Sequence, residues 1–506
     1  MLKRILSLLI IFLIAGFAAP VPCVFAEGGT DWDSPIRIPS PAYSNSWFPD
    51  VAVDRQQNVH VIWSETGDFG AGITASEALM YSVWNGSQWS QFTDIVPPQA
   101  DIIRSAMTIT EDDIIHVLFD SDPPFSLYYK SVPASSAYSA ARWGKPMVVN
   151  GREHTYMSDI VSWGSNLHIV YDDGQFYEKE CAGCADIFYR SSPDNGLTWS
   201  EPVVLLNTKL GSARAQIEVD GAGNLYVTWD EGWDRLTGLG SADHGIFMFS
   251  RDQGRTWSVP LLIEYPNNTN IQLTPAGNGK GGIMLVWRTI SPNYPAIYYS
   301  WSTDWGNTWT LPQTLPNIAS SQLENSFDIY DMAVDASGHI HLVATGYLAS
   351  NRIESADFSN PPGLFHFEWD GENWSLPKVI FQSSWYPLYP KISISHGNQL
   401  YVVWHMRESI HSQMGYHQLW FAHGRSSAEY IEANISETTS PQTEAVMINT
   451  PTAEQPQETP TILPISSEPM RGNPFSEIDE YLILLVGIIP AAILIWIVMS
   501  RKSKNP

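Results

Sequence analysis

Cysteine is scarce in this sequence, with three residues among 506. So few cysteines exclude a fold that depends on a dense framework of disulfides. Cys23 lies in an apolar N-terminal stretch, and only two residues separate Cys181 from Cys184. We expect this pair to form a small loop disulfide in an oxidising compartment, with a redox motif as the alternative. A metal site would require a second cysteine pair or a neighbouring histidine.

Basic residues are also few. The chain has 27 Lys and Arg against 53 Asp and Glu, which gives a net charge of −26, and only 16% of its residues are charged. Nucleic acid is therefore excluded as a partner, because its phosphates require a basic face. Aromatic residues are abundant instead, with 21 Trp. This composition is typical of a secreted β-rich protein.

An eight-residue motif, Ser-x-Asp-x-Gly-x-Thr-Trp, occurs three times, beginning at Ser192, Ser250 and Ser302. A repeat of this kind determines the architecture of the whole chain. The Asp and Gly suit a tight turn, because Asp bonds nearby backbone N–H groups and Gly tolerates positive φ. We expect the closing Thr-Trp to begin a strand and to deliver a large apolar anchor.

This motif resembles the Asp box, the bacterial neuraminidase repeat of sialidases and other β-propellers. The resemblance implies an all-β propeller and says less about activity, since in that family the box lies on the side away from the active site. Around the three boxes, weaker copies of a Trp-led strand occur at Trp32, Trp89, Trp143 and Trp374. Period-two alternation between them predicts sets of three further strands.

Seven Trp-led strands and seven three-strand sets predict a seven-bladed β-propeller over residues 30–427. The strand at Trp32 has no set before it, and the set after Trp374 has no Trp-led strand after it. We therefore expect the N-terminal strand to complete the last blade, which removes free sheet edges. Six blades, as in sialidases, is the alternative if the unit around Trp143 is not a blade.

The two ends of the chain predict a membrane-anchored extracellular protein. Residues 1–26 have the pattern of a secretory signal peptide. Residues 428–478 are rich in Thr, Pro and Glu and predict a disordered stalk. Residues 479–500 predict one transmembrane helix, and the basic residues 501–506 a cytoplasmic tail. The expected location is therefore the cell membrane, with a single span and the propeller outside.

Arg37-Ile38-Pro39 resembles the Arg-Ile-Pro motif that carries a carboxylate-binding arginine in sialidases. Its distance from Trp32 equals that of Val204 from Trp199 and of Val379 from Trp374. That register belongs to the outermost strand of a blade. We therefore expect Arg37 to lie far from the propeller axis, which makes the resemblance a coincidence.

Propeller ligands gather where the innermost strands begin and the second strands end. Alignment of the inner strands at their last aliphatic residue places one residue per unit at this mouth: Phe48, Arg104, Tyr156, Arg214, Ile329 and Tyr389. The fifth unit has an insertion near Asn270 and cannot be aligned. Guanidinium groups bind carboxylates bidentately, and flat rings stack on sugars, so these residues suit an acidic sugar. Alternatively, they fill the top of the channel.

The ends of the second strands provide a set of charged residues at the same rim: Glu65, Asp120, Asp173, Asp230, Glu231, Arg288 and Arg407. Crowded carboxylates raise one another's pKa and supply a general acid, or they hold Ca²⁺ through oxygen ligands. A third interpretation is that these acids are ordinary turn residues on a solvated rim. Apart from possible Ca²⁺, we expect no cofactor.

Two functional hypotheses follow. One is a surface-displayed propeller that binds a glycan or a protein ligand. The other is a retaining exo-sialidase or a related glycoside hydrolase, for which the resemblance implies a Tyr nucleophile activated by a Glu, an Asp acid and three arginines. The sequence does not pair a Tyr with a Glu, and the stalk and anchor suit capture, so we favour binding. A scaffold or sensor in an envelope complex is a third hypothesis.

Overall fold

The computed structural model describes residues 29–432 apart from short ranges: 42–43, 68–75, 100–101, 103, 122–125, 151–154, 156, 175–183, 233–241, 265–269, 290–295, 321–327, 350–360 and 408–416. The expected signal peptide and transmembrane span lie outside these residues. Within the described part, no helix is long and apolar enough to cross a membrane. All regular structure there is β, apart from two short 3₁₀ helices, η1 (Ala134–Ser136) and η2 (Ala140–Arg142).

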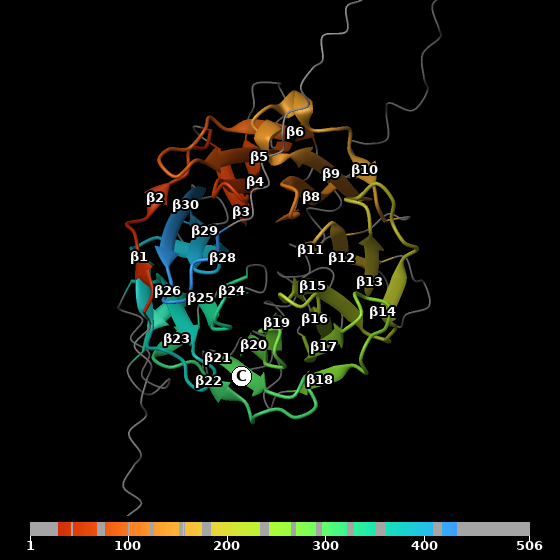
Figure 1. The fold of residues 1–506 in the computed structure, drawn as a ribbon, viewed down its shortest axis with the longest axis vertical. Helices are drawn as coiled ribbons and strands as arrows, with labels where there is room; N and C mark the ends of the chain where they lie inside the picture. The colour runs from red at the N-terminus through yellow and green to blue at the C-terminus, as the bar shows by residue number, and fades with distance from the viewer. Residues whose placement is uncertain are drawn as a thin grey trace, which may run out of the picture. The chain divides into compact units, whose positions relative to one another are not determined.

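The strands form seven antiparallel sheets, one per blade, arranged around a common centre (Figure 1). The first four blades contain these strands: β3 (Asn45–Val53), β4 (Val59–Gly67), β5 (Ser76–Trp84) and β6 (Thr93–Gln99); β7 (Ser105–Ile109), β8 (Ile114–Ser121), β9 (Ser126–Pro133) and β10 (Met147–Val148); β11 (Ser158–Trp163), β12 (Asn166–Asp173), β13 (Asp186–Ser192) and β14 (Val203–Leu206); β15 (Gly211–Val219), β16 (Leu225–Gly232), β17 (His244–Ser250) and β18 (Leu261–Glu264).

Blades 5 to 7 contain these strands: β19 (Asn270–Gly277), β20 (Ile283–Thr289), β21 (Ile297–Ser302) and β22 (Gln313–Thr314); β23 (Ile318–Ser320), β24 (Tyr330–Val334), β25 (Ile340–Leu348), β26 (Gly363–Trp369) and β27 (Lys378–Gln382); β28 (Tyr386–Ser395), β29 (Gln399–Arg407) and β30 (His417–Arg425), with β1 (Asp31–Trp32) and β2 (Ile36–Arg37). The seven-bladed prediction is therefore confirmed, and the unit around Trp143 is a blade.

The N-terminal strands complete the seventh blade, as the sequence predicts. Trp32 pairs with Gly424 and Ile36 with Phe421, so β1 and β2 form the outer edge of the sheet that begins with β28. Arg37 lies on this outermost strand and is exposed, which confirms that it is far from the axis. The ring of blades is closed by the two ends of the propeller sequence.

One aromatic contact is repeated between every pair of neighbouring blades. The Trp that precedes each outermost strand packs edge-on against a ring on the third strand of the preceding blade, with centroids 5.1 to 5.9 Å apart. The seven pairs are Trp32–His366, Trp89–Phe421, Trp143–Tyr81, Trp199–Tyr129, Trp257–Tyr189, Trp309–Phe247 and Trp374–Tyr299. Edge-to-face geometry stabilises such pairs by about 0.5–1.5 kcal/mol beyond their buried area. The Trp repeat in the sequence is therefore an inter-blade contact.

Each Asp box is a turn held by its own side chains. In the second box, Asp252 accepts hydrogen bonds from the Thr256 N–H (2.8 Å) and hydroxyl (2.7 Å), and from the Ser250 hydroxyl (2.8 Å). The Gly254 N–H donates to Ser250 Oγ at 2.8 Å. The boxes at Ser192 and Ser302 repeat these bonds. These donors hold the pKa of Asp252 below its ordinary value.

The expectation that Thr-Trp begins a strand is wrong. The outermost strands of the three Asp-box blades begin at Val203, Leu261 and Gln313, four residues after each Trp. A proline lies three residues after each Trp, at Pro202, Pro260 and Pro312. Proline has no N–H to donate to the ladder, so pairing begins only beyond it.

Gly254 provides a test of the Asp-box geometry. It has a φ of +80°, and a Cβ there would lie 1.9 Å from Tyr189 Oη, in a buried ring that is also bonded to His168. Gly86 has a similar φ of +89° with no atom nearby. We expect Gly254→Ala to lower the free energy of unfolding by about 2 kcal/mol more than Gly86→Ala, because only the first adds overpacking. Denaturant unfolding of both variants measures the difference; equal losses would contradict the contact.

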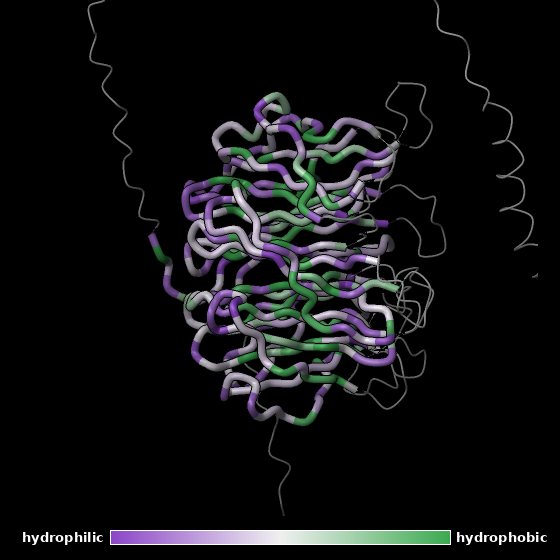
Figure 2. Tube along the Cα trace, turned by 90° about the vertical axis from the view of Figure 1, so that its right-hand side faces the viewer, coloured by the Kyte–Doolittle hydropathy of each residue, from purple (hydrophilic) through white to green (hydrophobic). Residues whose placement is uncertain are grey.

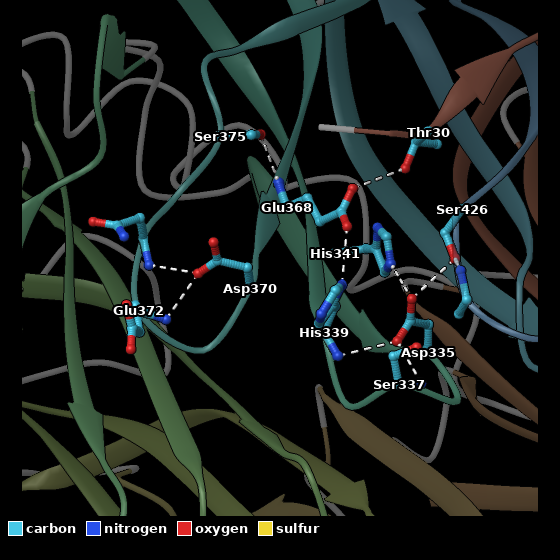
Figure 3. Close-up of polar contacts among 12 residues, drawn as sticks. Thr30, Asp335, Ser337, His339, His341, Glu368, Asp370, Glu372, Ser375 and Ser426 are labelled. Carbon is cyan, nitrogen blue, oxygen red and sulfur yellow. Dashed lines mark hydrogen bonds and ion pairs between the residues drawn. The ribbon is translucent and has the colours of Figure 1, made fainter. Parts of the chain in front are cut away.

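Polar contacts reinforce the closure next to β1 (Figure 3). The Thr30 hydroxyl donates to Glu368 Oε2 at 3.3 Å, and His339 Nδ1 lies 3.0 Å from Glu368 Oε1. Lys378 Nζ donates to the Thr30 carbonyl. Glu368 and Lys378 belong to blade 6, so the N-terminal segment is bonded to two blades.

Five residues of the range expected to be stalk, 428–432, belong to the described structure. The Ile431 N–H donates to the His396 carbonyl at 2.8 Å, and the Tyr430 ring stacks on His396 at 5.3 Å. Gln57 in blade 1 donates to the Tyr430 hydroxyl at 2.7 Å. This segment therefore connects the last blade to the first.

The core lies between the sheets. Figure 2 shows hydrophobic stretches running through the stacked sheets, with hydrophilic residues at the turns. The second strand of each blade is the most deeply buried, and four of these strands carry a tryptophan with at most 1% exposure: Trp63, Trp229, Trp287 and Trp404. These buried second strands pair with the innermost strands and hold the beginnings of the innermost strands around the channel.

Candidate functional site

A bulge shapes the start of the inner strand in four blades. The register shifts between Trp47 and Asp50, and at the equivalent points of β15, β19 and β28. The residue in each bulge has a positive φ, between 47° and 60°: Phe48, Arg214, Gln272 and Tyr389. Three of these four are residues that the sequence places at the mouth. The left-handed conformation, which is unfavourable for side-chain-bearing residues, marks a constrained position.

A small pocket lies at this mouth of the channel, with a volume of about 30 Å³. Its lining includes three cationic side chains, Arg104, Arg214 and Lys391, and three carboxylates, Asp50, Asp159 and Asp328. Met157 and Tyr389 are also part of the wall. The space suits a water molecule or one hydroxyl group. We call this pocket the mouth pocket.

Two arginines of the mouth pocket face the same carboxylate. Arg214 Nη1 lies 2.5 Å from Asp328 Oδ1, and Arg104 Nη1 lies 3.9 Å from Asp328 Oδ2. Burial alone would raise the pKa of Asp328, but the two guanidinium groups hold it below its ordinary value. Asp328 is therefore ionised at neutral pH. Arg214 Nε also lies 3.7 Å from Asp230, on the second strand of the same blade.

Aromatic rings surround Arg104 on the other side. Its guanidinium carbon lies 5.1 Å from the centroid of Phe48 and 5.5 Å from that of Tyr389. The two rings meet each other edge-on at 5.0 Å. Cation–π contacts of this kind are worth about 0.5–2 kcal/mol, depending on desolvation. The structure thus brings Phe48, Arg104, Arg214 and Tyr389 together from three neighbouring blades and one across the channel.

Arg288 and Tyr330 lie beside this group. Arg288 is fully buried, and burial together with the nearby Arg214 lowers its pKa to about 10. The Tyr330 hydroxyl donates to the Gln272 carbonyl at 2.6 Å. Burial raises the pKa of Tyr330 well above its ordinary value, and that of Tyr389 to about 12. Both phenols are therefore protonated at neutral pH, and a neighbouring general base would be needed to activate either of them as a nucleophile.

Deeper in the channel, Lys391 is surrounded by carboxylates. Asp50, Asp159 and Asp331 act on its charge and raise its pKa well above the ordinary value, against the effect of burial. Each of these carboxylates accepts the backbone N–H of the next blade, from Met107, Ile217 and Ile392 at 2.7 to 2.9 Å. Burial raises the pKa of Asp50 to about 7 and that of Asp159 to about 6. We call Lys391 and these three carboxylates the channel cluster.

The remaining residues expected at the rim have other surroundings. Glu65 and Glu231 point into their own blades, where each accepts bonds from a tryptophan indole and an inner-strand serine. Arg407 lies near the buried pair His405 and His417, and its charge helps to lower their pKa values. None of these three is among the residues that line the mouth pocket.

Asp120 and Asp173 are buried, with 1% and 2% exposure. Burial and the neighbouring Asp172 raise the pKa of Asp120 well above its ordinary value. Asp173 is paired in register with Asp186 on β13. Tyr156 lies outside the described residues, as does Cys181, although Cys184 is disulfide-bonded. No described group of three or more His, Cys, Asp or Glu side chains is arranged to hold a metal ion.

Sequence reasoning missed four residues of this region. Gln272 holds the mouth position of the fifth unit, where its amide bridges to Tyr330 O and Ile329 N at 2.8 Å. Met157 holds the mouth position of the third unit. Asp159 in that unit is equivalent to Gln216 in the fourth, and Met157 precedes Asp159 by two residues, as Arg214 precedes Gln216. Asp328 and Lys391 were also missed. The alternation of inner-strand side chains is a signal for Lys391, since it lies two residues after Tyr389, but it gives none for Asp328, which directly precedes the aligned residue Ile329.

The opposite mouth of the channel holds a larger cavity of about 580 Å³. Its lining combines aliphatic residues with the carboxylates of Glu218, Asp220 and Asp335, and Lys280 is the exposed cation at its rim. Asp220 accepts hydrogen bonds from its own turn and from the buried Tyr226 hydroxyl. Asp335 accepts a bond from its own turn and lies 3.1 Å from Nε2 of the buried His341 (Figure 3). Among the described residues, the lining of this cavity contains no arginine, in contrast to that of the mouth pocket.

Seven blades joined by tryptophan contacts, three Asp-box turns and a channel mouth that contains arginines define a sialidase-like β-propeller. Residues 131–402, more than half of the chain, match the family described as BNR repeat-like domain. The chain therefore belongs to this family.

Curated relatives include two kinds of enzyme. The chain is 25% identical over 212 residues to an ulvan lyase of Nonlabens ulvanivorans, a match that covers 41% of this chain and 38% of the lyase. It is 24% identical over 213 residues to a sialidase of Paraclostridium sordellii, covering 35% of this chain and 52% of the sialidase. The chain thus spans about half or less of the length of these relatives.

Among solved structures, the chain is similar to a protein of unknown function from Dyadobacter fermentans DSM 18053, with 12% identity and a TM-score of 0.45. That match covers 79% of this chain and 99% of the other. It is also similar to the NanB sialidase from Streptococcus pneumoniae, with 12% identity, a TM-score of 0.42 and coverage of 78% and 70%.

Proposed function

We propose that this chain is a membrane-anchored, extracellular propeller that binds a glycan at the mouth pocket. The observation that supports it is the convergence of Arg104 and Arg214 on Asp328 beside the Tyr389 ring, on the channel axis. Sugar hydroxyls both donate and accept, so a guanidinium–carboxylate pair offers them matched partners.

The proposed location rests on the sequence. An uncharged, almost wholly apolar run from Tyr481 to Met499 is followed at once by Arg501 and Lys502, which agrees with a single span and a cytoplasmic tail. A cell-surface propeller on a stalk suits capture of a glycan from outside the cell. A protein ligand would use the same rim of the channel.

A glycoside hydrolase of the sialidase type is the second candidate. The sialidases among the relatives and the presence of Arg104, Arg214 and Arg288 near one another favour it. It would require a general base to take the proton of Tyr330 or Tyr389, because burial raises the pKa of both phenols. Binding without turnover requires no such step, and it is the function that we favour.

The test uses the purified full chain on an array of neutral and acidic glycans, with Arg104→Ala and Arg214→Ala variants. Loss of a charge-assisted hydrogen bond should weaken glycan binding by about tenfold or more in each variant. Arg37→Ala is the matched control, since this arginine is exposed on the outer edge, and it should bind as the parent does.

A fluorogenic sialoside assay on the same proteins separates the two candidates. We expect no turnover by the parent at acidic or neutral pH. Turnover that is lost in both the Arg104 and Arg214 variants, and kept in Arg37→Ala, would establish the hydrolase instead. A parent that binds no glycan and turns over no sialoside would overturn both.

A further inference from the structure

Asp328 supplies the negative charge that faces Arg104 and Arg214 at the mouth pocket. The side chains of Arg104, Arg214 and Asp328 are 9%, 5% and 7% exposed, so all three are largely withdrawn from solvent. Arg214 donates a charge-assisted hydrogen bond to Asp328, with Nη1 2.5 Å from Oδ1. A free carboxylate that approached these arginines would have to compete with Asp328.

Asp328 is held in place by contacts between three blades. Its carbonyl accepts the Tyr389 N–H from blade 7 at 2.9 Å. The N–H of the next residue, Ile329, donates to the Gln272 side chain of blade 5 at 2.8 Å. The peptide group that follows the Asp328 side chain is therefore bonded to blades 5 and 7.

The mouth pocket also contains carboxyl groups beside its cations. Three cations and three carboxylates line it, as described above. An additional anion would meet Asp328 at close range, and like charges in a partly desolvated site repel strongly. A hydroxyl group avoids this repulsion, since it donates to Asp328 and accepts from a guanidinium. The free volume of about 30 Å³ admits one such group.

We infer that the mouth pocket selects an uncharged, hydroxyl-rich sugar over an anionic one, and that Asp328 sets this selection by occupying both arginines. The inference rests on the proposed function, because it assigns the class of glycan bound at the same site. Replacement of the Asp328 charge should remove the counter-charge that Arg104 and Arg214 share, so that a ligand carboxylate is no longer repelled there and the preference is reversed.

The experiment uses calorimetry to measure binding of N-acetylneuraminic acid and of its methyl ester, which lacks the carboxylate charge and carries one added methyl group. The parent should bind the ester at least about tenfold more tightly than the acid. Asp328→Asn, which keeps the shape of the side chain, should bind the acid at least about tenfold more tightly than the parent does. Asp370→Asn is the control: it removes one negative charge from an exposed turn and should leave both affinities unchanged.

Several results would overturn the inference. A parent that binds the acid more tightly than the ester would do so, and so would an Asp328→Asn protein that gains no affinity for the acid. If Asp328→Asn does not fold, Asp328→Ser takes its place with the same expected gain. Failure of the proposed function gives a different pattern, in which the parent binds nothing on the glycan array and the Arg104 and Arg214 variants behave as the parent does.

Discussion

A chain that lacks residues 29–39 should lose most of its folding stability. This deletion removes β1 and β2, and with them Trp32, Ile36 and the fully buried Ile38. Full burial of such a side chain contributes about 1.5–3 kcal/mol, and Trp32 and Ile36 are partly buried, so the loss is at most about 9 kcal/mol. Because natural domains are stable by only about 5–15 kcal/mol, we expect the thermal transition of the propeller to become non-cooperative or to vanish.

The loss extends beyond one blade. Trp32 packs into the cluster between blades 6 and 7, whereas Ile36 and Ile38 pack into the cluster between blades 7 and 1. The deletion also exposes β30 as a free edge, so we expect aggregation. Circular dichroism melts and light scattering test both effects. Arg37→Ala, in the same strand but exposed, should change the stability by no more than about 0.5 kcal/mol. A truncated chain that melts as the parent does would show that blade 7 is stable with three strands.

The sequence predicted the fold because the Trp repeat is a physical contact. Each Trp must reach a ring of the preceding blade, so its spacing is constrained even where the Asp box itself is lost, as at Trp143. The same reasoning identified Trp32 as the member that belongs to the last blade. Because every blade requires this contact, the tryptophan recurs once per blade in the sequence.

The site was only partly predictable. Arg104, Arg214 and Tyr389 were identified because their units align at the last aliphatic residue of the inner strand. In the third unit the alignment is displaced by one residue. Its last aliphatic residue, Val161, is structurally equivalent to Glu218 of the fourth unit and not to the last aliphatic residue there, Val219. A shift of one residue exchanges the two faces of a strand, which is why Met157 was missed. At Gln272 the bulge was hidden, because positive φ at a residue other than Gly leaves no compositional signal.

Asp328 illustrates a second limit. The alignment selected its neighbour Ile329, which carries no charge, and passed over the carboxylate that the two arginines share. Recognition of an ion pair between residues 114 and 224 positions apart depends on the closed ring of blades rather than on any local pattern. The mouth pocket is therefore a property of the tertiary structure.

Lys391→Met should destabilise the protein strongly, and more so at alkaline than at acidic pH. The lysine is the cation of the channel cluster, and its removal leaves Asp50, Asp159 and Asp331 facing one another. Removal of one partner from a buried charge network costs about 3–5 kcal/mol. We expect this loss at about pH 8, where the carboxylates are ionised, and less than half of it at about pH 5.

The sign of this dependence follows from the carboxyl groups. Burial raises the pKa of native Asp50 to about 7 and of native Asp159 to about 6, whereas unfolded carboxyls titrate near about 4. Between these values the native state holds more protons than the unfolded state, so the free energy of unfolding falls as the pH rises. Without Lys391 the native pKa values rise further, and the decline becomes steeper and extends to higher pH.

Urea unfolding of the parent and of Lys391→Met at the two pH values measures the difference directly. Lys280→Met is the matched control, because this lysine is exposed at the opposite mouth of the channel, and its effect should be small at both pH values. An equal loss for Lys391→Met at acidic and alkaline pH would mean that its role is packing rather than charge. A loss that grows with pH would instead establish that the three carboxylates, each bonded to the backbone of the next blade, depend on one lysine to remain ionised in the centre of the ring.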